Sequence, residues 1–215
     1  MVSIRAALPL VVGALLAGCA LAPAEPVPLT PAQQAREEKA FGALQRGTQT
    51  FQADLRQAVL VRPIFQTLVS VGTIGYRAPD KLEVRFSQPA GQSLRIDDGI
   101  VTLTQPGKPP RHIPLDSSNG QNAASLLDFF RTDGARWRRD FTVAMARDGE
   151  QLFVTLTPLP GSLKAGHVEQ IVTTLRLPDH EVTAMRISVN PFIRVDYQFT
   201  RNRRNVPLDP DLLAP

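Results

Sequence analysis

The chain contains a single cysteine, Cys19, so no disulfide can form within it. The cysteine follows a short apolar segment, residues 6–16, which comes after one positive charge, Arg5. This is the layout of an export signal. The apolar segment has roughly half the length that a bilayer-spanning helix needs, which favours a cleavable signal over a transmembrane anchor.

The residues at the cysteine, Leu16-Ala17-Gly18-Cys19, resemble the lipobox of bacterial lipoproteins. The resemblance implies that residues 1–18 are removed as a lipoprotein signal peptide, and that the thiol and the new amino terminus are both acylated. An aspartate after the cysteine would suggest retention in the inner membrane. Ala20 stands there instead and favours a lipid anchor in the outer membrane, facing the periplasm. The alternatives are a conventional signal followed by a buried cysteine, or a transmembrane anchor.

Motifs for catalysis or metal binding are missing elsewhere. His112, His167 and His180 lie far apart in the sequence, without other ligands at helical or hairpin spacing. There is no nucleophile elbow and no phosphate-binding glycine loop. Asp97 and Asp98 are adjacent, but they occupy a predicted hairpin tip, where aspartates serve turn geometry. We therefore expect no enzyme, no metal and no cofactor, with a hydrolase as the most remote alternative.

The charge balance is close to neutral. The formal net charge is +4, and it falls to +3 without Arg5, which is too small to imply nucleic acid as a partner. Arginine clusters at residues 136–139 and 201–204 could meet anionic lipid headgroups, at about 1 kcal/mol per charge near a membrane. The alternative is a solvated face. The length suits one domain with a sizeable core, and we expect a monomer.

The first predicted helix follows a proline-rich stretch, residues 20–31, which favours an extended tether. Thr30, Pro31 and Gln33 form a helix start with a capping box. The helix should run to about Leu44 and stop near Gly47. The next segment alternates in polarity from residue 51 to residue 56, which predicts a strand with one buried face. A helix through residue 59 is the alternative.

The body of the chain alternates strands with turn signals. Short connections favour antiparallel pairing in an up-and-down sheet, and Asp98-Gly99 and Asp148-Gly149 are the clearest hairpin tips. One segment instead has helical periodicity, with Ala123, Leu126, Leu127 and Phe130 on one side. This amphipathic helix must lie across the sheet. The predicted strands are residues 65–76, 81–87, 92–96, 100–104, 141–146, 151–157, 167–177, 181–189 and 192–200.

Apolar side chains share one face of several predicted strands, as the alternation of residues 82, 84 and 86 shows. Such faces form either a solid core or the wall of an apolar cavity under the amphipathic helix. Periodicity does not separate these alternatives. The candidate ligand-binding residues are Leu82, Val84, Phe86, Leu94, Ile96, Leu126 and Phe130.

Residues 51–57, 72–83, the Asp98-Gly99 turn and residues 192–205 resemble the LolA carriers of the bacterial periplasm. The resemblance covers about residues 37–205. It implies a mainly β fold with short helices: an incomplete antiparallel β-barrel, LolA/LolB-like, with a helical lid and a concave apolar face that receives lipoprotein acyl chains or other lipids.

Two features depart from the family. The family's basic residue before the proline falls on Ala78, with Arg77 one step earlier, and the final strand beyond Asn205 is missing. The resemblance therefore divides the chain into a signal peptide (1–18), a lipidated cysteine with its tether (19–35), a LolA-like lipid-binding domain (36–205) and a C-terminal tail (206–215).

From these observations we predict a lipoprotein that binds acyl chains or other lipids noncovalently and helps to transport them in the periplasm or at the outer membrane. The alternatives are a LolB-like lipoprotein acceptor that inserts its cargo, or a structural envelope lipoprotein with a filled core that transports nothing.

Overall fold

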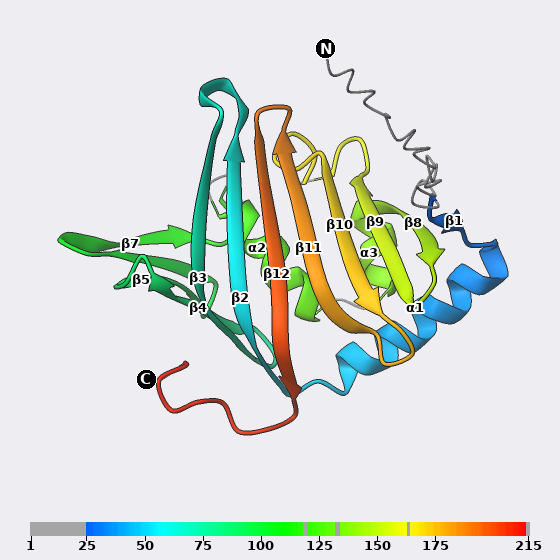
Figure 1. Cartoon of the computed structure of the whole chain (residues 1–215), viewed down its shortest axis with the longest axis horizontal. Coiled ribbons are helices and arrows are strands. Elements are labelled where there is room, and N and C mark those ends of the chain that lie inside the picture. The colour runs from blue at the N-terminus through cyan, green and yellow to red at the C-terminus, as the bar shows by residue number, and fades with distance from the viewer. Residues whose placement is uncertain (1–24, 118–119, 132–133, 163, 214–215) are drawn as a thin grey trace, which may run out of the picture.

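The computed structural model describes residues 25–117, 120–131, 134–162 and 164–213 (Figure 1). The predicted signal peptide and Cys19 lie outside the described residues. Within the described chain, every helix is too short or too polar to cross a membrane.

Twelve strands of the described chain form one antiparallel sheet in the order β1-β8-β9-β10-β11-β12-β2-β3-β4-β5-β6-β7. The strands are β1 (Val27–Pro28), β2 (Thr50–Val61), β3 (Gln66–Arg77), β4 (Lys81–Gln88), β5 (Gln92–Asp97), β6 (Ile100–Gln105), β7 (Lys108–Pro114), β8 (Phe141–Asp148), β9 (Gln151–Pro158), β10 (Gln170–Arg176), β11 (Glu181–Asn190) and β12 (Ile193–Arg204). The helices are α1 (Pro31–Arg46), the short 3₁₀ helix η1 (Arg62–Ile64), α2 (Gln121–Arg131) and α3 (Gly134–Asp140).

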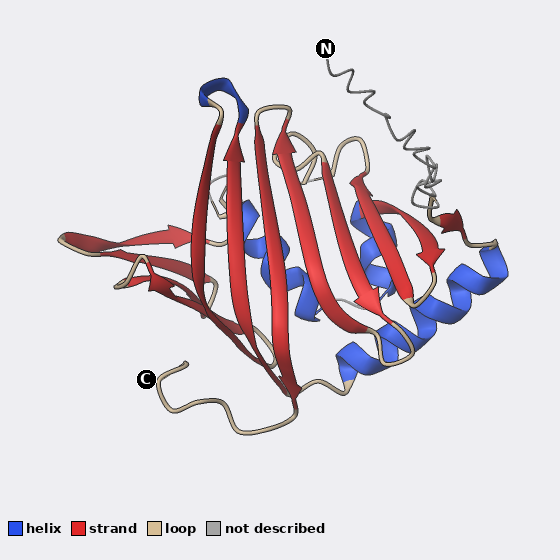
Figure 2. Cartoon of the chain, in the orientation of Figure 1, coloured by secondary structure: helices blue, strands red, loops and turns tan. Residues whose placement is uncertain are grey.

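The sheet consists of two meanders joined at their first and last strands. Strands β2 to β7 follow one another, strands β8 to β12 do the same, and β12 pairs with β2. Edge strands β7 and β1 do not pair, so the barrel stays open. The connection from β7 to β8 must therefore pass from one side of the sheet to the other. Helices α2 and α3 make this crossing on one face of the sheet (Figures 1 and 2).

Local sequence signals account for the first helix and for the turns. The Thr30 hydroxyl accepts a hydrogen bond from the Gln33 N–H, and the Gln33 side chain accepts one from the Thr30 N–H, which is the predicted capping box. The helix stops at Gly47, as predicted. Asp98 and Gly99 both have positive φ, as a tight hairpin turn between β5 and β6 requires.

Three elements were not expected from the sequence. Strand β7 contains Pro109 and Pro110, which is tolerated because β7 is an edge strand and only one side of its backbone pairs. Helix α3 is too short to show a period, but its Trp137 is buried and stacks on Phe41, with ring centroids 5.4 Å apart. Strand β1 extends the sheet beside β8. The expectation that only one helix interrupts the strands was therefore wrong.

Both ends of the described chain are packed. The segment predicted as a tether contains β1 and the first turn of α1. In the segment predicted as a tail, Leu212 and Leu213 are buried, and the Leu213 N–H donates to the buried Glu83 carboxylate at 2.8 Å. The structured part therefore extends beyond residues 36–205 in both directions. The predicted strand 167–177 also begins later, at Gln170.

The core lies between the inner face of the sheet and helices α2 and α3. An aromatic cluster forms its centre, where the Phe130 ring of α2 packs on Phe51, Tyr76 and Phe129 at centroid distances of 4.9, 5.1 and 5.1 Å. Aromatic pairs at these distances contribute about 0.5–1.5 kcal/mol each beyond their burial. This cluster fixes α2 to β2 and β3.

We expect Gly72→Ala to destabilise the fold by more than about 2 kcal/mol. A Cβ atom at Gly72 would lie 2.0 Å from the Arg85 carbonyl oxygen and 2.8 Å from the Phe86 Cα, so β3 and β4 would have to separate. Gly47→Ala is the control, because the new Cβ would lie 3.5 Å from its nearest neighbour, the Ala43 carbonyl oxygen, and the φ of Gly47 is negative. Urea unfolding followed by circular dichroism measures both, and equal midpoints would contradict the prediction.

Candidate functional site

A hollow of about 140 Å³ lies between α2 and the inner face of the sheet. We call it the apolar hollow. Its apolar wall comes from β4, β5, β6 and α2. Polar side chains come from β2 and β12, and also from Gln92, Ser93, Thr104 and Gln105 of β5 and β6. The residues used below are Val84, Phe86, Leu94, Leu103, Leu126, Gln57 and Tyr197.

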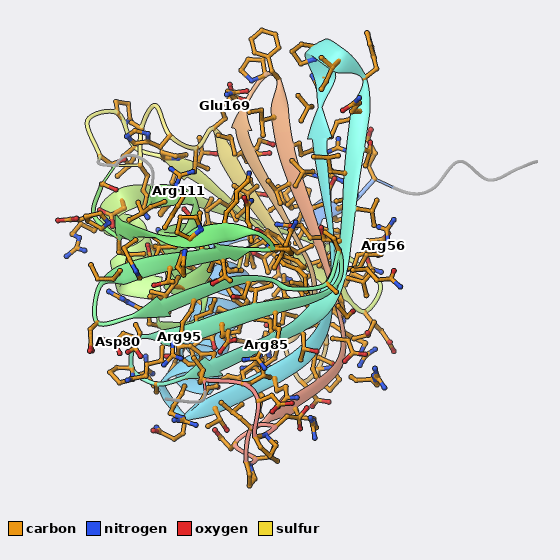
Figure 3. All side chains as sticks on the ribbon, turned by 90° about the vertical axis from the view of Figure 1, so that its left-hand side faces the viewer. Arg56, Asp80, Arg85, Arg95, Arg111 and Glu169 are labelled. Atoms are coloured by element: carbon orange, nitrogen blue, oxygen red, sulfur yellow. The ribbon has the colours of Figure 1, made fainter. Side chains whose placement is uncertain are left out.

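Strand register builds the wall. Val84 of β4 lies opposite Leu94 of β5, which lies opposite Leu103 of β6. The alternate residues point outward and are polar, and Figure 3 labels two of them, Arg85 and Arg95. These outward arginines pair with the Glu83 and Asp97 carboxylates. The period-2 pattern thus separates a charged outer face from an apolar inner one.

Two polar side chains at the hollow, those of β2 and β12, bond to each other. The Gln57 amide donates a hydrogen bond to the Tyr197 hydroxyl at 3.2 Å. Burial raises the pKa of the Tyr197 phenol, which therefore stays neutral. A ligand in the hollow would meet aliphatic carbon and neutral groups, which suits a hydrocarbon chain.

The structure divides the seven predicted ligand-binding residues into two groups. Val84, Phe86, Leu94 and Leu126 line the apolar hollow. The other three lie in the packed core. Leu82 and Ile96 face each other across β4 and β5 and are 0% exposed, and Phe130 belongs to the aromatic cluster.

Sequence reasoning missed the other seven lining residues of the hollow, and Leu103 and Tyr197 show why. Leu103 belongs to a predicted strand, but only the register of β6 shows that it extends the wall of Val84 and Leu94. Tyr197 comes from β12, which is far from β4 in the sequence but curves toward the same space. In the sequence, Tyr197 is one aromatic residue within a predicted strand, and nothing there indicates that it lines the hollow.

A wider groove of about 820 Å³ lies between the turns after β3 and β5 and helices α2 and α3. Four aspartates and three cations line it, and many are paired: Lys164 Nζ lies 3.0 Å from an Asp128 carboxylate oxygen. An acyl chain placed here would strip water from these ions. The groove is therefore less suited to a hydrocarbon than the apolar hollow.

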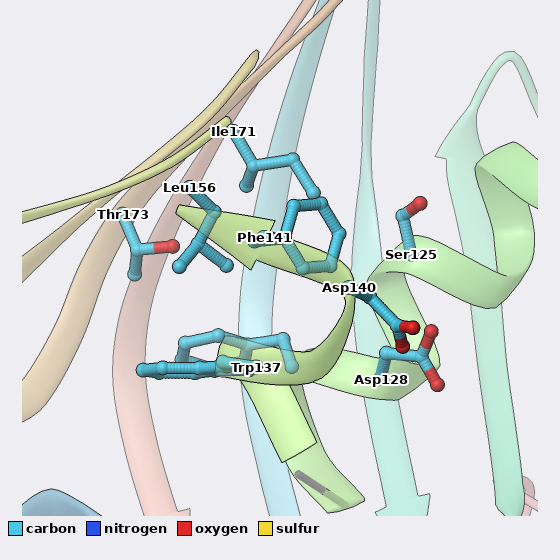
Figure 4. Close-up of a pocket in the computed structure, with 9 residues that line it drawn as sticks. Ser125, Asp128, Trp137, Asp140, Phe141, Leu156, Ile171 and Thr173 are labelled. Atoms are coloured by element: carbon cyan, nitrogen blue, oxygen red, sulfur yellow. The ribbon is translucent and has the colours of Figure 1, made fainter. Parts of the chain in front are cut away.

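A third, small cavity of about 20 Å³ lies under α3 (Figure 4). Trp137, Phe141, Leu156 and Ile171 form its apolar part, and the Asp128 carboxylate lies at its edge. This volume holds about one water molecule. It is too small for a lipid.

The apolar hollow is also small for a whole acyl chain. An engineered apolar cavity of about 150 Å³ in another protein holds one benzene molecule, so the apolar hollow holds a short segment of chain. A longer chain requires α2 to move away from the sheet. Three contacts oppose this movement: the aromatic cluster at Phe130, the Lys164–Asp128 ion pair, and a 2.8 Å hydrogen bond from the Gln45 side chain to the Phe129 carbonyl.

No model of a protein family matches the sequence, and no curated protein matches it either. Several solved structures are similar. MucB aligns with 86% of this chain at a TM-score of 0.53 and 14% identity, and this chain spans 63% of MucB. A LolA superfamily protein from Nitrosomonas europaea aligns with 83% of this chain and 96% of its own length, at a TM-score of 0.41 and 11% identity.

A putative outer membrane lipoprotein-sorting protein domain from Vibrio parahaemolyticus is similar as well. The Mycobacterium tuberculosis lipoprotein LppX is also similar, with 84% of this chain and 99% of LppX covered at a TM-score of 0.47 and 10% identity. At identities this low, the likeness concerns the fold alone. The predicted architecture, an incomplete antiparallel barrel with short helices, is confirmed.

We expect Leu82→Glu and Phe86→Glu to have different effects on folding. A glutamate at fully buried Leu82 would place an unpaired charge in the packed core and cost more than about 3 kcal/mol. Partly exposed Phe86 borders the apolar hollow, so a carboxylate there reaches water and the protein folds. Circular dichroism and urea unfolding separate the two variants. A Leu82→Glu protein as stable as the parent would show that this part of the core is hydrated.

Proposed function

We propose that this LolA-like protein binds lipid acyl chains noncovalently in the apolar hollow and helps to transport them in the bacterial envelope. The observation that carries the proposal is the hollow itself, in which Val84, Leu94 and Leu103 form a continuous aliphatic wall and Leu126 of α2 closes the other side. No turnover is involved. The resemblance of residues 72–83 to LolA carriers supports the same function.

In this proposal α2 is the lid. Each methylene that enters the hollow contributes about 0.8 kcal/mol, so a chain of eight methylenes gains about 6 kcal/mol. That gain is comparable to the roughly 2–5 kcal/mol contributed by the contacts that a movement of α2 would break, which are two aromatic pairs of Phe130, one ion pair and one hydrogen bond. The lid can therefore open for a long chain and close again when the chain leaves.

We further propose that Cys19 carries the lipid anchor and that the anchor lies in the outer membrane. Val27, the first residue of β1, is eight residue steps beyond Cys19. Even fully extended, they span at most about 29 Å. The domain would therefore stay close to the bilayer surface. Cell fractionation tests the anchor, because a Cys19→Ser chain should leave the membrane fraction.

A second candidate function, a LolB-like acceptor that inserts its cargo into the membrane, is favoured by two protruding hairpins. The β2–β3 and β11–β12 hairpins end side by side at the top of the sheet (Figures 1 and 3). They carry large apolar side chains in solvent, with Phe65 92% exposed. We call these residues the apolar tips: Ile64, Phe65, Leu68 and Phe192.

The apolar tips are held rigidly. The Arg62 N–H donates to the Phe192 carbonyl at 2.8 Å and joins one hairpin to the other. The Asn190 side chain accepts hydrogen bonds from the N–H groups of Phe192 and Ile193, both at 2.9 Å. Rigid, protruding apolar side chains suit insertion into a lipid surface. Contact with a bilayer would let cargo pass without crossing water.

For the carrier function, we expect Phe86→Glu to weaken binding of a fluorescent fatty acid at least about 100-fold. The carboxylate must lose its water when an acyl chain enters, at a cost of several kcal/mol. Ser87→Glu is the matched control, since it adds the same charge to an exposed position of β4 on the opposite face. Equal affinities in both variants would remove the apolar hollow as the site. Mass spectrometry of organic extracts from the purified chain identifies the natural lipid.

For the acceptor function, we expect the fluorescence of a Phe65→Trp variant, anchored in liposomes, to be quenched by lipids with brominated acyl chains. The native Trp137 is buried and gives a constant background. Arg111→Trp, on exposed β7, is the control and should not be quenched. Quenching that is absent, or equal in both variants, would count against insertion of the apolar tips.

A further inference from the structure

Arg204, near the end of β12, turns its guanidinium into the protein without meeting a carboxylate. Its Nη1 donates to the Thr48 hydroxyl at 3.1 Å and to the Gln45 side-chain oxygen at 3.5 Å, and its Cζ lies 5.3 Å from the centre of the Phe51 ring. Its Nη2 is buried, and no described residue accepts a hydrogen bond from it. Every described partner of Arg204 is neutral.

The neighbouring arginines of the same strand are different. Arg201 pairs with the Asp54 carboxylate, and Arg203 pairs with Asp209 at 3.0 Å. A charge that is withdrawn from water without a counterion is costly. Burial accordingly lowers the pKa of Arg204 from its ordinary value. A bound anion would remove this cost.

A hollow of about 190 Å³ adjoins the partners of Arg204. Gln45 and Thr48, which accept its hydrogen bonds, are also part of the wall of this hollow. Arg46 of α1 and Arg131 of α2 line it as well, and no described carboxylate does. We call this space, together with Arg204 behind its wall, the arginine hollow.

The surroundings of the two lining arginines leave them available. Arg46 is exposed and forms no ion pair with a described residue. Arg131 has one acidic neighbour on its own helix, Asp128, at the long distance of 3.9 Å. The Asp80 carboxylate is close enough to help raise the pKa of the Tyr76 phenol, which lies at the edge of the hollow. Two guanidinium groups thus line a space that the side chains of Gln45, Thr48 and Gln49 complete, and a third, that of Arg204, lies behind its wall.

We propose that the arginine hollow binds an oxyanion, a phosphate or a carboxylate group. Guanidinium groups bind such anions through paired, charge-assisted hydrogen bonds, and Gln49 adds a neutral polar side chain. Two sources share this chemistry: the headgroup of an acidic lipid and free phosphate. The site does not require the carrier function, because the anion contacts none of the residues of the apolar hollow.

The test is calorimetric titration of the purified full chain with inorganic phosphate, with sodium chloride at matched ionic strength as the blank. We expect saturable binding that Arg204→Gln weakens at least about tenfold. Arg203→Gln is the matched control, since it removes the same charge from the adjacent, exposed position and should change the affinity less than about twofold.

Arg46→Gln provides the test if Arg204→Gln fails to fold. Arg46 is exposed, so its replacement should weaken phosphate binding while the chain stays folded.

A short-chain phosphatidylglycerol that binds at least about tenfold more tightly than glycerol phosphate assigns the site to a lipid headgroup. Equal affinities assign it to the free anion. The proposal is overturned if phosphate does not bind, or if Arg203→Gln and Arg204→Gln lose affinity equally. Fatty-acid titration of the Arg204→Gln chain reports separately on the carrier function.

Discussion

The constraint on which this structure depends is the crossing from β7 to β8. Because β12 pairs with β2, the two strands that this connection must join lie at or near opposite edges of an open sheet. The chain must therefore pass over the sheet, and the apolar side of α2 provides the surface that it buries there. The open barrel, its core and its hollows all follow from where α2 lies.

Two side chains of α2 face two different hollows. Leu126 and Phe130 are one turn apart and face the same way. Leu126 borders the apolar hollow, while Phe130 packs into the aromatic cluster and forms part of the arginine hollow. Along this helix the environment changes from aliphatic to cationic. A molecule with an apolar chain and an anionic end would match this change, with its chain beside the aliphatic part and its anionic group beside the cationic part.

Much of this arrangement could be predicted from local patterns. Capping at Thr30, the Asp98-Gly99 turn and the period of α2 are properties of short segments, and the structure confirms them. The arginine hollow could not be predicted, because a register shift in β12 between Thr200 and Arg203, where Arg201 has positive φ, breaks the alternation. A bulge re-aims the following side chains. Arg204 therefore lies opposite inward-facing Phe51, although the sequence showed only a run of basic residues.

Both hollows share α2, so their occupancies are linked. Moving α2 outward to admit an acyl chain displaces Leu126 and also Arg131, which contributes one of the charges of the arginine hollow. An anion that holds Arg131 in place therefore favours the closed position of the lid. By thermodynamic linkage, if a bound anion lowers the affinity for an acyl chain by some factor, a bound chain lowers the affinity for the anion by the same factor. If one lipid supplies both groups, its headgroup and its acyl chain favour opposite positions of α2, so the headgroup limits how far the lid opens and how long the bound part of the chain can be.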